Sequence, residues 1–401
     1  MANNNKHTGP NVPALRFPEF SGEWESRTIG DDCKILMCKR IFANQTTPEG
    51  EVPFYKIGTI GDKADAYISK KLFEEYKQRY NYPKCGEVMI TCAGTVGKTI
   101  LYNGQDAYYQ DSNIVWISNP RKIYSNEFLN YLLNRVDWSK LNSTTITRIY
   151  NDNLRELHIT FPSREEQDKI VSLLTRIDDR IDTQSKIIEE LKTLRGALNE
   201  SLYCCCESYQ ELSFNDVGVS YSGLSGKSGN DFGSGYPFIP YTNIFTNNII
   251  DEGQLEYVQV REDESQNSVC FGDLLMTLSS ETPEEVGIGA VYLGHESPMY
   301  LNSFAFGIHI TRTDLVYPPY LSWLVSTKSF RKFILPYAQG STRYNLQKTD
   351  FMKAKYRFPT LGQQKAISVL LSGYSSKIEN EERVLNKYTA LKQGLIEQLF
   401  I

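Results

Sequence analysis

Residues 163–203 read SREEQDKIVSLLTRIDDRIDTQSKIIEELKTLRGALNESLY, with no proline and a single glycine. Apolar residues recur in alternating steps of four and three, which is typical of a long helix that packs along its length against another helix. At about 1.5 Å per residue, this helix would be roughly 60 Å long. The apolar members of the seam are Ile170, Leu174, Ile177, Ile181, Ile188, Leu191, Leu198 and Leu202.

A second copy of this seam lies 197 positions later, in residues 360–401. The polar positions of the seam recur as well, because Gln184 corresponds to Glu381 and Arg195 corresponds to Lys392. A register shared over about 40 residues indicates an internal duplication. The apolar members of the second seam are Ile367, Leu371, Tyr374, Ile378, Leu385, Tyr388, Leu395 and Leu399.

The regions that precede the two helices are also related. Between their shared positions they differ almost everywhere, as expected if two copies of one fold bind different targets. We expect strands near 52–60, 87–91 and 113–117 and a helix over 126–141 in the first region. The matching landmarks are Pro53-Phe54 with Pro237-Phe238, Val96-Gly97 with Val286-Gly287, and Thr147-Arg148-Ile149-Tyr150-Asn151 with Thr342-Arg343-Tyr344-Asn345.

These patterns predict an α+β protein with two similar mixed α/β regions and a pseudo-twofold internal duplication. The two regions would be separated by two long helices that form a coiled coil. The helices must run antiparallel if they pair, because the first leads from one region into the other and the second leaves that other region. The expected segments are a disordered start at 1–12, a first region at 13–162, a helix at 163–203, a second region at 204–359 and a helix at 360–401.

The composition excludes several classes of protein. A chain of 401 residues suggests two or three domains. No run approaches the roughly 18 apolar residues of a membrane helix, and residues 1–20 lack the apolar core of a signal peptide. We therefore expect a cytoplasmic protein that does not bind a membrane. The eight Cys and four His are not spaced as in a disulfide framework or a zinc site, so we expect no metal.

The charge distribution argues weakly against a strong nucleic-acid binder. The net charge is −5, and residues 204–359 contain 17 acidic and 11 basic residues. Residues 1–162 are nearly balanced, with 20 basic and 18 acidic residues. A chain of this kind would bind DNA by sharing phosphate contacts with a partner or by gathering a few Lys and Arg on one face.

Two fragments resemble catalytic motifs without completing them. The sequence GTVGKT at 94–99 is similar to the end of a phosphate-binding loop, but Cys92 occupies the position of the required first glycine. The sequence YPPY at 317–320 is similar to an amino-methyltransferase motif, but Tyr317 replaces the side chain that accepts from the target amino group. We therefore predict no catalytic residues in this chain.

Four further features resemble one family. They are RFPEFSGEW at 16–24, VMIT at 88–91 followed by GTVG at 94–97, the Thr/Arg stretch before each long helix, and the sequences PSREEQ at 162–167 and PTLGQQ at 359–364 where the helices start. On these residues the chain resembles, over essentially its whole length, the specificity subunits of type I restriction-modification enzymes.

The resemblance implies a function and a set of partners. Each region would be a target recognition domain that reads one half of a bipartite double-stranded DNA sequence, and the helices would set the number of unread base pairs. Two methyltransferase (M) subunits and two ATP-driven restriction/translocase (R) subunits would assemble on the chain. The chain itself would hold no cofactor, because S-adenosylmethionine, ATP and Mg would be bound by those partner subunits.

Hydroxyl, amide and arginine groups in exposed turns are the groups best suited to reading bases. An alternative is that these polar residues only satisfy backbone groups in turns. The primary candidates are Thr144, Thr145, Thr147, Arg148 and Tyr150 in the first region, and Ser341, Thr342, Arg343, Tyr344 and Asn345 in the second. Secondary candidates are Thr59, Lys98, Tyr241, Thr242 and Asn243.

A second function class also fits the sequence. The chain would then be a coiled-coil scaffold protein that assembles partner proteins and reads no DNA. The acidic second region slightly favours this alternative, whereas unlike regions built on matched scaffolds favour DNA reading.

Overall fold

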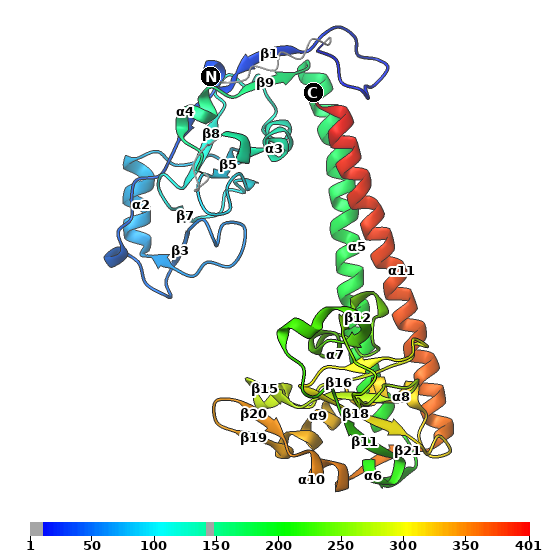
Figure 1. Cartoon of the computed structure of the whole chain (residues 1–401). Coiled ribbons are helices and arrows are strands. Elements are labelled where there is room, and N and C mark those ends of the chain that lie inside the picture. The colour runs from blue at the N-terminus through cyan, green and yellow to red at the C-terminus, as the bar shows by residue number, and fades with distance from the viewer. Residues whose placement is uncertain (1–10, 142–147) are drawn as a thin grey trace. The chain divides into compact units, whose positions relative to one another are not determined.

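The computed structural model describes residues 11–141 and 148–401 (Figure 1). The chain divides into two compact units, which are unit 1 (Met1–Thr183 with Leu385–Ile401) and unit 2 (Gln184–Val384). Each unit contains one globular region and a part of both long helices, α5 (Arg164–Cys204) and α11 (Leu361–Leu399). The predicted bounds of both helices lie within two residues of the observed ones.

Unit 1 is built around a four-stranded antiparallel sheet with the strand order β2-β8-β5-β6. Side chains alternate between the two faces of a strand, and both faces are buried. Val88, Ile90 and Val115 pack into one apolar core, whereas Met89 and Trp116 pack into another. The strands are β2 (Lys34–Leu36), β5 (Val88–Thr91), β6 (Thr99–Leu101) and β8 (Ile114–Ser118).

Among its described residues, unit 1 also contains two smaller sheets and four short α-helices. The sheets have the orders β4-β3-β7 and β1-β9. Their strands are β1 (Glu25–Thr28), β3 (Val52–Tyr55), β4 (Tyr67–Ile68), β7 (Tyr108–Tyr109) and β9 (His158–Phe161). The α-helices are α1 (Ile29–Asp32), α2 (Lys70–Arg79), α3 (Asn126–Arg135) and α4 (Asn151–Arg155), and the 3₁₀ turns are η1 (Ala43–Gln45) and η2 (Trp138–Leu141).

Unit 2 repeats the three sheets of unit 1 with the orders β11-β18-β14-β16, β13-β12-β17 and β10-β21. The pairing of β12 with β17 is parallel, as is the equivalent pairing of β3 with β7. These strands are β10 (Tyr209–Ser213), β11 (Gly218–Ser222), β12 (Phe232–Ile239), β13 (Glu256–Val258), β14 (Leu274–Thr277), β16 (Gly289–Val291), β17 (Tyr300–Leu301), β18 (Ala305–Ile310) and β21 (Lys355–Pro359).

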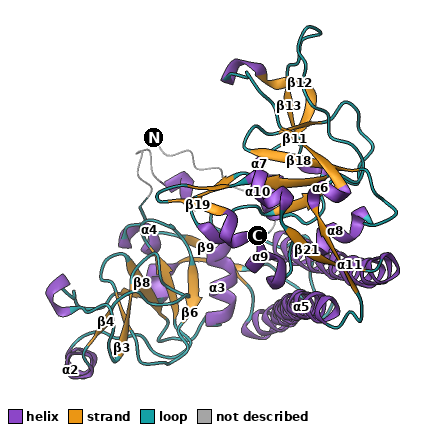
Figure 2. Cartoon of the chain, turned by 90° about the horizontal axis from the view of Figure 1, so that it is seen from below, coloured by secondary structure: helices purple, strands orange, loops and turns teal. Residues whose placement is uncertain are grey.

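Unit 2 also contains a fourth sheet, with the order β15-β20-β19. Figure 2 separates its strands and helices by colour. The additional strands are β15 (Ser279–Ser280), β19 (Ala338–Gly340) and β20 (Tyr344–Leu346). The α-helices are α6 (Phe214–Val217), α7 (Tyr241–Thr246), α8 (Pro318–Leu324), α9 (Lys328–Ile334) and α10 (Lys348–Lys353), and the 3₁₀ turns are η3 (Gly229–Asp231), η4 (Glu252–Gln254), η5 (Pro283–Glu285) and η6 (Leu335–Tyr337).

Two expected elements are shorter than the sequence suggested. The strand expected over 52–60 ends at Tyr55, because the next residues form a turn in which the backbone N–H of Thr59 donates to the carbonyl of Lys56 at 3.0 Å. The helix expected over 126–141 ends at Arg135, because Val136 has extended backbone angles. The strands expected at 87–91 and 113–117 are β5 and β8.

A buried glutamine anchors the start of each long helix in the same way. Gln167 donates to the carbonyl of Pro162 at 2.9 Å and accepts from the backbone N–H of Ser125 at 2.8 Å. Gln364 donates to the carbonyl of Pro359 at 2.8 Å and accepts from the backbone N–H of Tyr317 at 2.8 Å. Each amide also reaches a third backbone group, the carbonyl of Ile123 or Leu315. The duplication therefore extends to individual hydrogen bonds.

The parts of α5 and α11 in unit 2 run antiparallel. Arg195 donates to Ser375 at 2.8 Å, and Gln184 donates to the carboxylate of Glu381 at 2.6 Å. Lower residue numbers on α5 therefore pair with higher residue numbers on α11. Unit 1 has the equivalent of the first pair, because Lys392 lies 2.6 Å from Asp178.

The cations of these pairs also lie over aromatic rings at matching positions. Arg195 is 5.8 Å from the ring centre of Trp323, and Lys392 is 5.6 Å from that of Tyr131.

The predicted α+β class, with two similar mixed regions and two long antiparallel helices, is confirmed. Among the helices of the described residues, none combines the length and apolar character that crossing a membrane would require.

Replacing Gln364 by Met tests the buried anchor. Met has a similar volume but leaves three backbone groups without their partners, and each unsatisfied buried group costs about 1–3 kcal/mol. We expect the free energy of unfolding, measured by urea titration of the full chain, to fall by about 3 kcal/mol or more. Gln398→Met, at an exposed position of the same helix, is the matched control and should change it by less than about 0.5 kcal/mol. Equal values for the two variants would contradict the anchor.

Candidate nucleic-acid interface

The Thr/Arg stretch of unit 2 forms the tip of the hairpin that joins β19 and β20. Gly340 pairs with Tyr344, and the intervening Ser341, Thr342 and Arg343 are exposed. Gly340 has a φ of 154°, and a Cβ there would lie 2.0 Å from the carbonyl oxygen of Arg343, so the tight tip requires glycine. The hairpin thus presents hydroxyl and guanidinium groups at a defined position.

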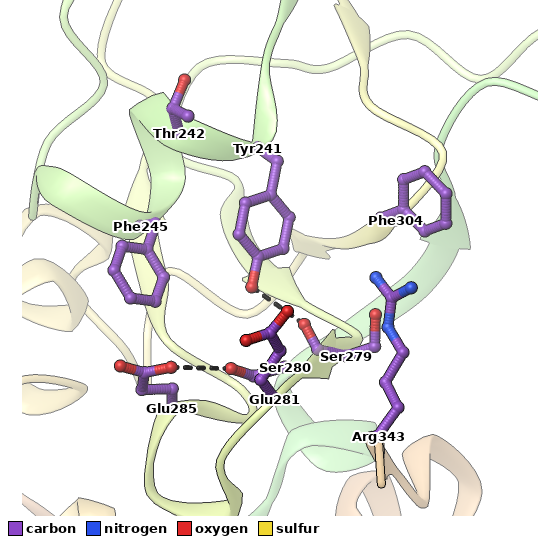
Figure 3. A pocket seen from close by; sticks show the side chains of 9 residues that line it. All are labelled: Tyr241, Thr242, Phe245, Ser279, Ser280, Glu281, Glu285, Phe304 and Arg343. Atoms are coloured by element: carbon purple, nitrogen blue, oxygen red, sulfur yellow. Dashed lines mark hydrogen bonds between the residues drawn. The ribbon is translucent and has the colours of Figure 1, made fainter.

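The hairpin borders a cavity of about 340 Å³ in unit 2 (Figure 3). The cavity brings Arg343 together with Tyr241 and Thr242, which are separated from it by about a hundred positions in the sequence. Tyr344 and Asn345 lie next to this wall, because β20 pairs with β15 in the register Ser280 to Tyr344 and Ser279 to Asn345. The residues that line the cavity are Tyr241, Thr242, Phe245, Ser279, Ser280, Glu281, Glu285, Phe304 and Arg343.

Internal hydrogen bonds hold several of these side chains in place. The Tyr241 hydroxyl donates to the carbonyl of Ser279 at 2.8 Å, and the Ser280 hydroxyl donates to Glu285 at 2.8 Å. Figure 3 shows both bonds as dashed lines. Burial raises the pKa of Tyr241, so its hydroxyl remains a donor at neutral pH. The guanidinium of Arg343 lies 5.6 Å from the ring centre of Phe304.

Unit 1 places its own arginine against the equivalent turn. Arg148 donates to the carbonyl of Ser112 at 3.2 Å and lies 5.8 Å from the ring centre of Tyr150, which is exposed. Ser112 belongs to the turn before β8, and Phe304 belongs to the turn before the equivalent strand β18. Both arginines therefore rest on the same part of the scaffold. The candidates Thr144, Thr145 and Thr147 lie outside the described residues.

The two secondary candidates of unit 1 take part in local structure. Thr59 accepts a hydrogen bond from the backbone N–H of Lys56 at 3.0 Å, and Lys98 donates to the carbonyl of Ile60 at 2.7 Å. These contacts match the alternative in which such residues satisfy backbone groups of a turn. Lys98 is nevertheless exposed to solvent along part of its side chain.

The structure corrects the sequence-based prediction that Asn243 contacts DNA. Its side chain is 0 % exposed, so it cannot face a nucleic acid. Its amide donates to the carbonyls of Asp251 and Gln254 at 2.9 and 3.2 Å, and its oxygen accepts from the backbone N–H of Asp251 at 3.0 Å. The side chain of Asn247 donates to the same oxygen. Asn243 therefore holds the loop after α7 rather than binding a ligand.

The net charge of the whole second region concealed a basic segment at 328–357. This segment contains eight basic residues and one acidic residue, and it begins at α9 and ends in β21. Counting charge in a shorter window would have found it. Its exposed cations, Lys328, Lys332, Arg343, Lys353, Lys355 and Arg357, are suited to phosphate contacts.

Arg331, in the same segment, has a different role. Its guanidinium donates to the backbone carbonyls of Glu284, Val286 and Gly287 at 2.6–2.8 Å. It thereby fixes the loop that carries Glu281 and Glu285 into the cavity wall. Sequence reasoning missed this residue, because nothing local distinguishes a cation that binds carbonyls from one that binds phosphate.

All sixteen predicted seam residues on α5 and α11 are buried or half-buried. Ile170 and Leu174 join the main core of unit 1 together with Leu399, and Ile367 and Leu371 join that of unit 2. The ends of the long helices are therefore part of the cores of the globular regions. The charged faces of the helices remain exposed.

One group of described residues has side chains close enough to hold a metal ion, with ligand atoms of Cys270, Asp273 and His309 within 4.8 Å of one another. The Asp273 carboxylate already accepts from the Tyr221 hydroxyl at 2.7 Å and from the backbone N–H of Cys270 at 2.8 Å, and it lies 2.8 Å from His309 Nδ1. Glu87 accepts from the backbone N–H of Lys84 at the equivalent turn of unit 1. A shared turn explains this carboxylate without a metal.

Comparison with known proteins matches residues 21–193 to the type I restriction modification DNA specificity domain. This part of the chain is similar to the members of that family. A specificity subunit of a type I restriction enzyme from Haemophilus influenzae is 44% identical over 187 residues, which cover 47% of each chain. The specificity subunit of the MjaX type I enzyme from Methanocaldococcus jannaschii is 26% identical over 207 residues, or 48% of each chain. The matches thus span about half the length of these relatives.

Two solved structures extend the likeness in fold beyond the specificity domain. The S subunit of a type I restriction-modification system from M. genitalium has a TM-score of 0.53 at 16% identity, covering 97% of this chain and 99% of its own. A chain from a study of the assembly and conformational transition of the type I R-M system has a TM-score of 0.58 at 14% identity, covering 94% and 97%. At these identities the likeness establishes the fold, including that of the residues after 193.

Asn243→Ala tests whether Asn243 stabilises the fold of unit 2. The substitution removes all four side-chain hydrogen bonds and leaves buried backbone groups unpaired, so we expect the free energy of unfolding to fall by about 2–4 kcal/mol. Thr242→Ala changes the neighbouring exposed residue and should leave stability within about 0.5 kcal/mol of the native chain. Urea titration of both variants makes the comparison, and a larger loss for Thr242→Ala would refute the assignment.

Proposed function

We propose that this chain is the DNA-reading specificity subunit of a type I restriction-modification complex. Each unit would read one half of a bipartite target. One observation supports this function above all: the two units repeat the same three sheets and the same buried glutamine, yet the turn that borders the candidate interface in unit 2 encloses four more residues than its counterpart in unit 1. A shared scaffold with unlike exposed loops suits two readers of different sequences.

The chemistry of the interface fits this role. Sequence is read by side chains that reach base edges, whereas contacts to phosphate position the protein. Arg343 and the hydroxyls of Ser341 and Thr342 lie at an exposed hairpin tip. The segment 328–357 would supply cations that contact the phosphates of the DNA backbone. The remainder of 204–359 is strongly acidic, so binding would depend on this segment and on partner subunits.

The helices α5 and α11 would have two tasks in the complex. Their length would set the number of unread base pairs, because a stiff helix pair fixes a separation that a flexible linker does not. Their charged faces would bind two M subunits, and two R subunits would join the assembly. The reactions would take place on those partners in the cytoplasm, with S-adenosylmethionine for methylation and ATP and Mg for translocation and cleavage, while this chain selects the site without catalysing a step.

Co-expression with a partner methyltransferase, followed by modification-sensitive sequencing of the host DNA, tests the proposal. We expect methylated adenines at one bipartite motif with a gap of constant length, because two readers on one chain impose both half-sites at once. The partner expressed without this chain is the control and should leave that motif unmethylated. Methylation without a common motif would instead support the scaffold alternative.

Exchange of one region tests whether the readers are independent. Residues 13–142 would be replaced by the equivalent region of a relative with a different target, and the motif would be mapped again by the same sequencing. We expect one half-site to change while the other half-site and the gap stay the same, because α5, α11 and unit 2 keep their residues. A change in both half-sites would rule out independent reading.

A further inference from the structure

The scaffold turn after the central strand differs in length between the two units. In unit 1 the backbone N–H of Gly97 donates to the carbonyl of Thr91 at 2.9 Å, and in unit 2 that of Gly287 donates to Thr277 at 3.2 Å. Both glycines have positive φ, 84° and 66°. The same hydrogen bond therefore closes both turns, but the loop of unit 2 encloses four more residues. Unit 2 has an insertion at a position where the scaffold is otherwise shared.

The longer loop brings acidic groups into the cavity beside Arg343. It contains strand β15, which pairs with β20, and it contributes Glu281 and Glu285 to the cavity wall (Figure 3). Glu285 accepts from the Ser280 hydroxyl. For the side chains of Glu281 and Arg343, no hydrogen bond or ion pair is found among residues 11–141 and 148–401, and the Arg343 guanidinium lies 5.6 Å from the centre of the Phe304 ring. The cavity thus holds an unpaired carboxylate and an unpaired guanidinium.

These two groups have complementary and restricted hydrogen-bonding abilities. An ionised carboxylate only accepts hydrogen bonds, whereas a guanidinium only donates them and can donate two in parallel. In the major groove, guanine presents two neighbouring acceptors, O6 and N7, and its partner cytosine presents the N4 amino donor. An arginine beside a glutamate therefore matches the edge of one G·C pair, whereas an A·T pair has no two adjacent acceptors on one base.

We propose that unit 2 reads a G·C base pair in its half-site with Arg343 on guanine and Glu281 on cytosine. This inference rests on the proposed function and adds the identity of one base pair to it. The Phe304 ring supports the guanidinium from one side. Arg331 and the β15–β20 pairing hold the glutamate loop. The donor and the acceptor are therefore positioned before DNA binds, which lowers the entropy lost on binding.

The test uses the full chain with its methyltransferase partner and duplexes in which each base pair of the unit 2 half-site is substituted in turn. The region exchange described above identifies which half-site belongs to unit 2. We expect the native complex to require a G·C pair at one position. Arg343→Lys keeps the charge but loses the paired donors, so discrimination at that position should fall about ten- to hundredfold, since a bidentate contact contributes about 1–3 kcal/mol. Glu281→Gln should relax the preference for cytosine at the same pair.

Two controls separate base reading from other effects. Glu284→Gln removes a charge from the same loop at an exposed side chain outside the cavity wall and should leave the motif unchanged. Discrimination at the unit 1 half-site, measured for every variant, reports that the complex remains assembled and folded. Replacing the guanine by 7-deazaguanine removes N7 and should weaken binding by the native complex more than by the Arg343→Lys complex.

The possible outcomes distinguish failure of the base-pair assignment from failure of the proposed function. If the native complex has a bipartite motif but Arg343→Lys weakens all duplexes equally, the arginine binds phosphate and the base assignment is wrong. A unit 2 half-site without a G·C pair would also overturn it, while leaving the proposed function intact. Absence of any bipartite motif would instead refute the proposed function.

Discussion

The buried amide at the start of each long helix is the constraint on which the arrangement within each unit depends. Gln167 and Gln364 are at most 1 % exposed, and each joins three backbone groups that belong to different segments. One is the carbonyl of the proline at the end of the strand that leads into the helix, and the other two belong to the segment before α3 or α8. A glutamine is suited to this task because it donates and accepts at once. The direction in which each helix leaves its globular region is thereby fixed by the same three bonds.

A fixed scaffold allows the exposed loops to diverge without loss of the fold. The turns closed at Gly97 and Gly287 share one hydrogen bond, although unit 2 inserts four residues between its ends. Loop length affects closure entropy only slowly, so such an insertion is tolerated where the strands on both sides are held by buried neighbours. In unit 2 the insertion forms a strand of its own, β15, that lines the cavity beside Arg343. Differences between the exposed loops of the units therefore arise at positions where the scaffold places little demand on sequence.

The sequence predicted the parts of this protein that have a period or a repeat. The seams of α5 and α11 follow from the 3.5-residue spacing of Ile and Leu, and the recurring Gln-Gln or Glu-Gln before each seam identified the matching helix starts. Interactions between distant segments had no such signal. The burial of Asn243 depends on the loop around Asp251 and Gln254, and the role of Arg331 depends on carbonyls more than 40 positions away. The strand that ends at Tyr55 does so because a local turn competes successfully with the extended backbone.

The net charge of the chain said little about where it could bind DNA, and the distribution of charged residues explains why. Acidic residues predominate in 204–359, yet basic residues predominate eight to one in 328–357. Screening over a Debye length of about 8 Å means that a binding surface responds to nearby charges more than to the total. Acidic surroundings would also weaken binding to DNA of any sequence, because they repel the phosphates of every duplex. Contacts to bases would still favour the one sequence that they match, because they form only on that sequence. An acidic region with a local basic segment is therefore suited to selective rather than tight DNA binding, which is the property that the proposed function requires.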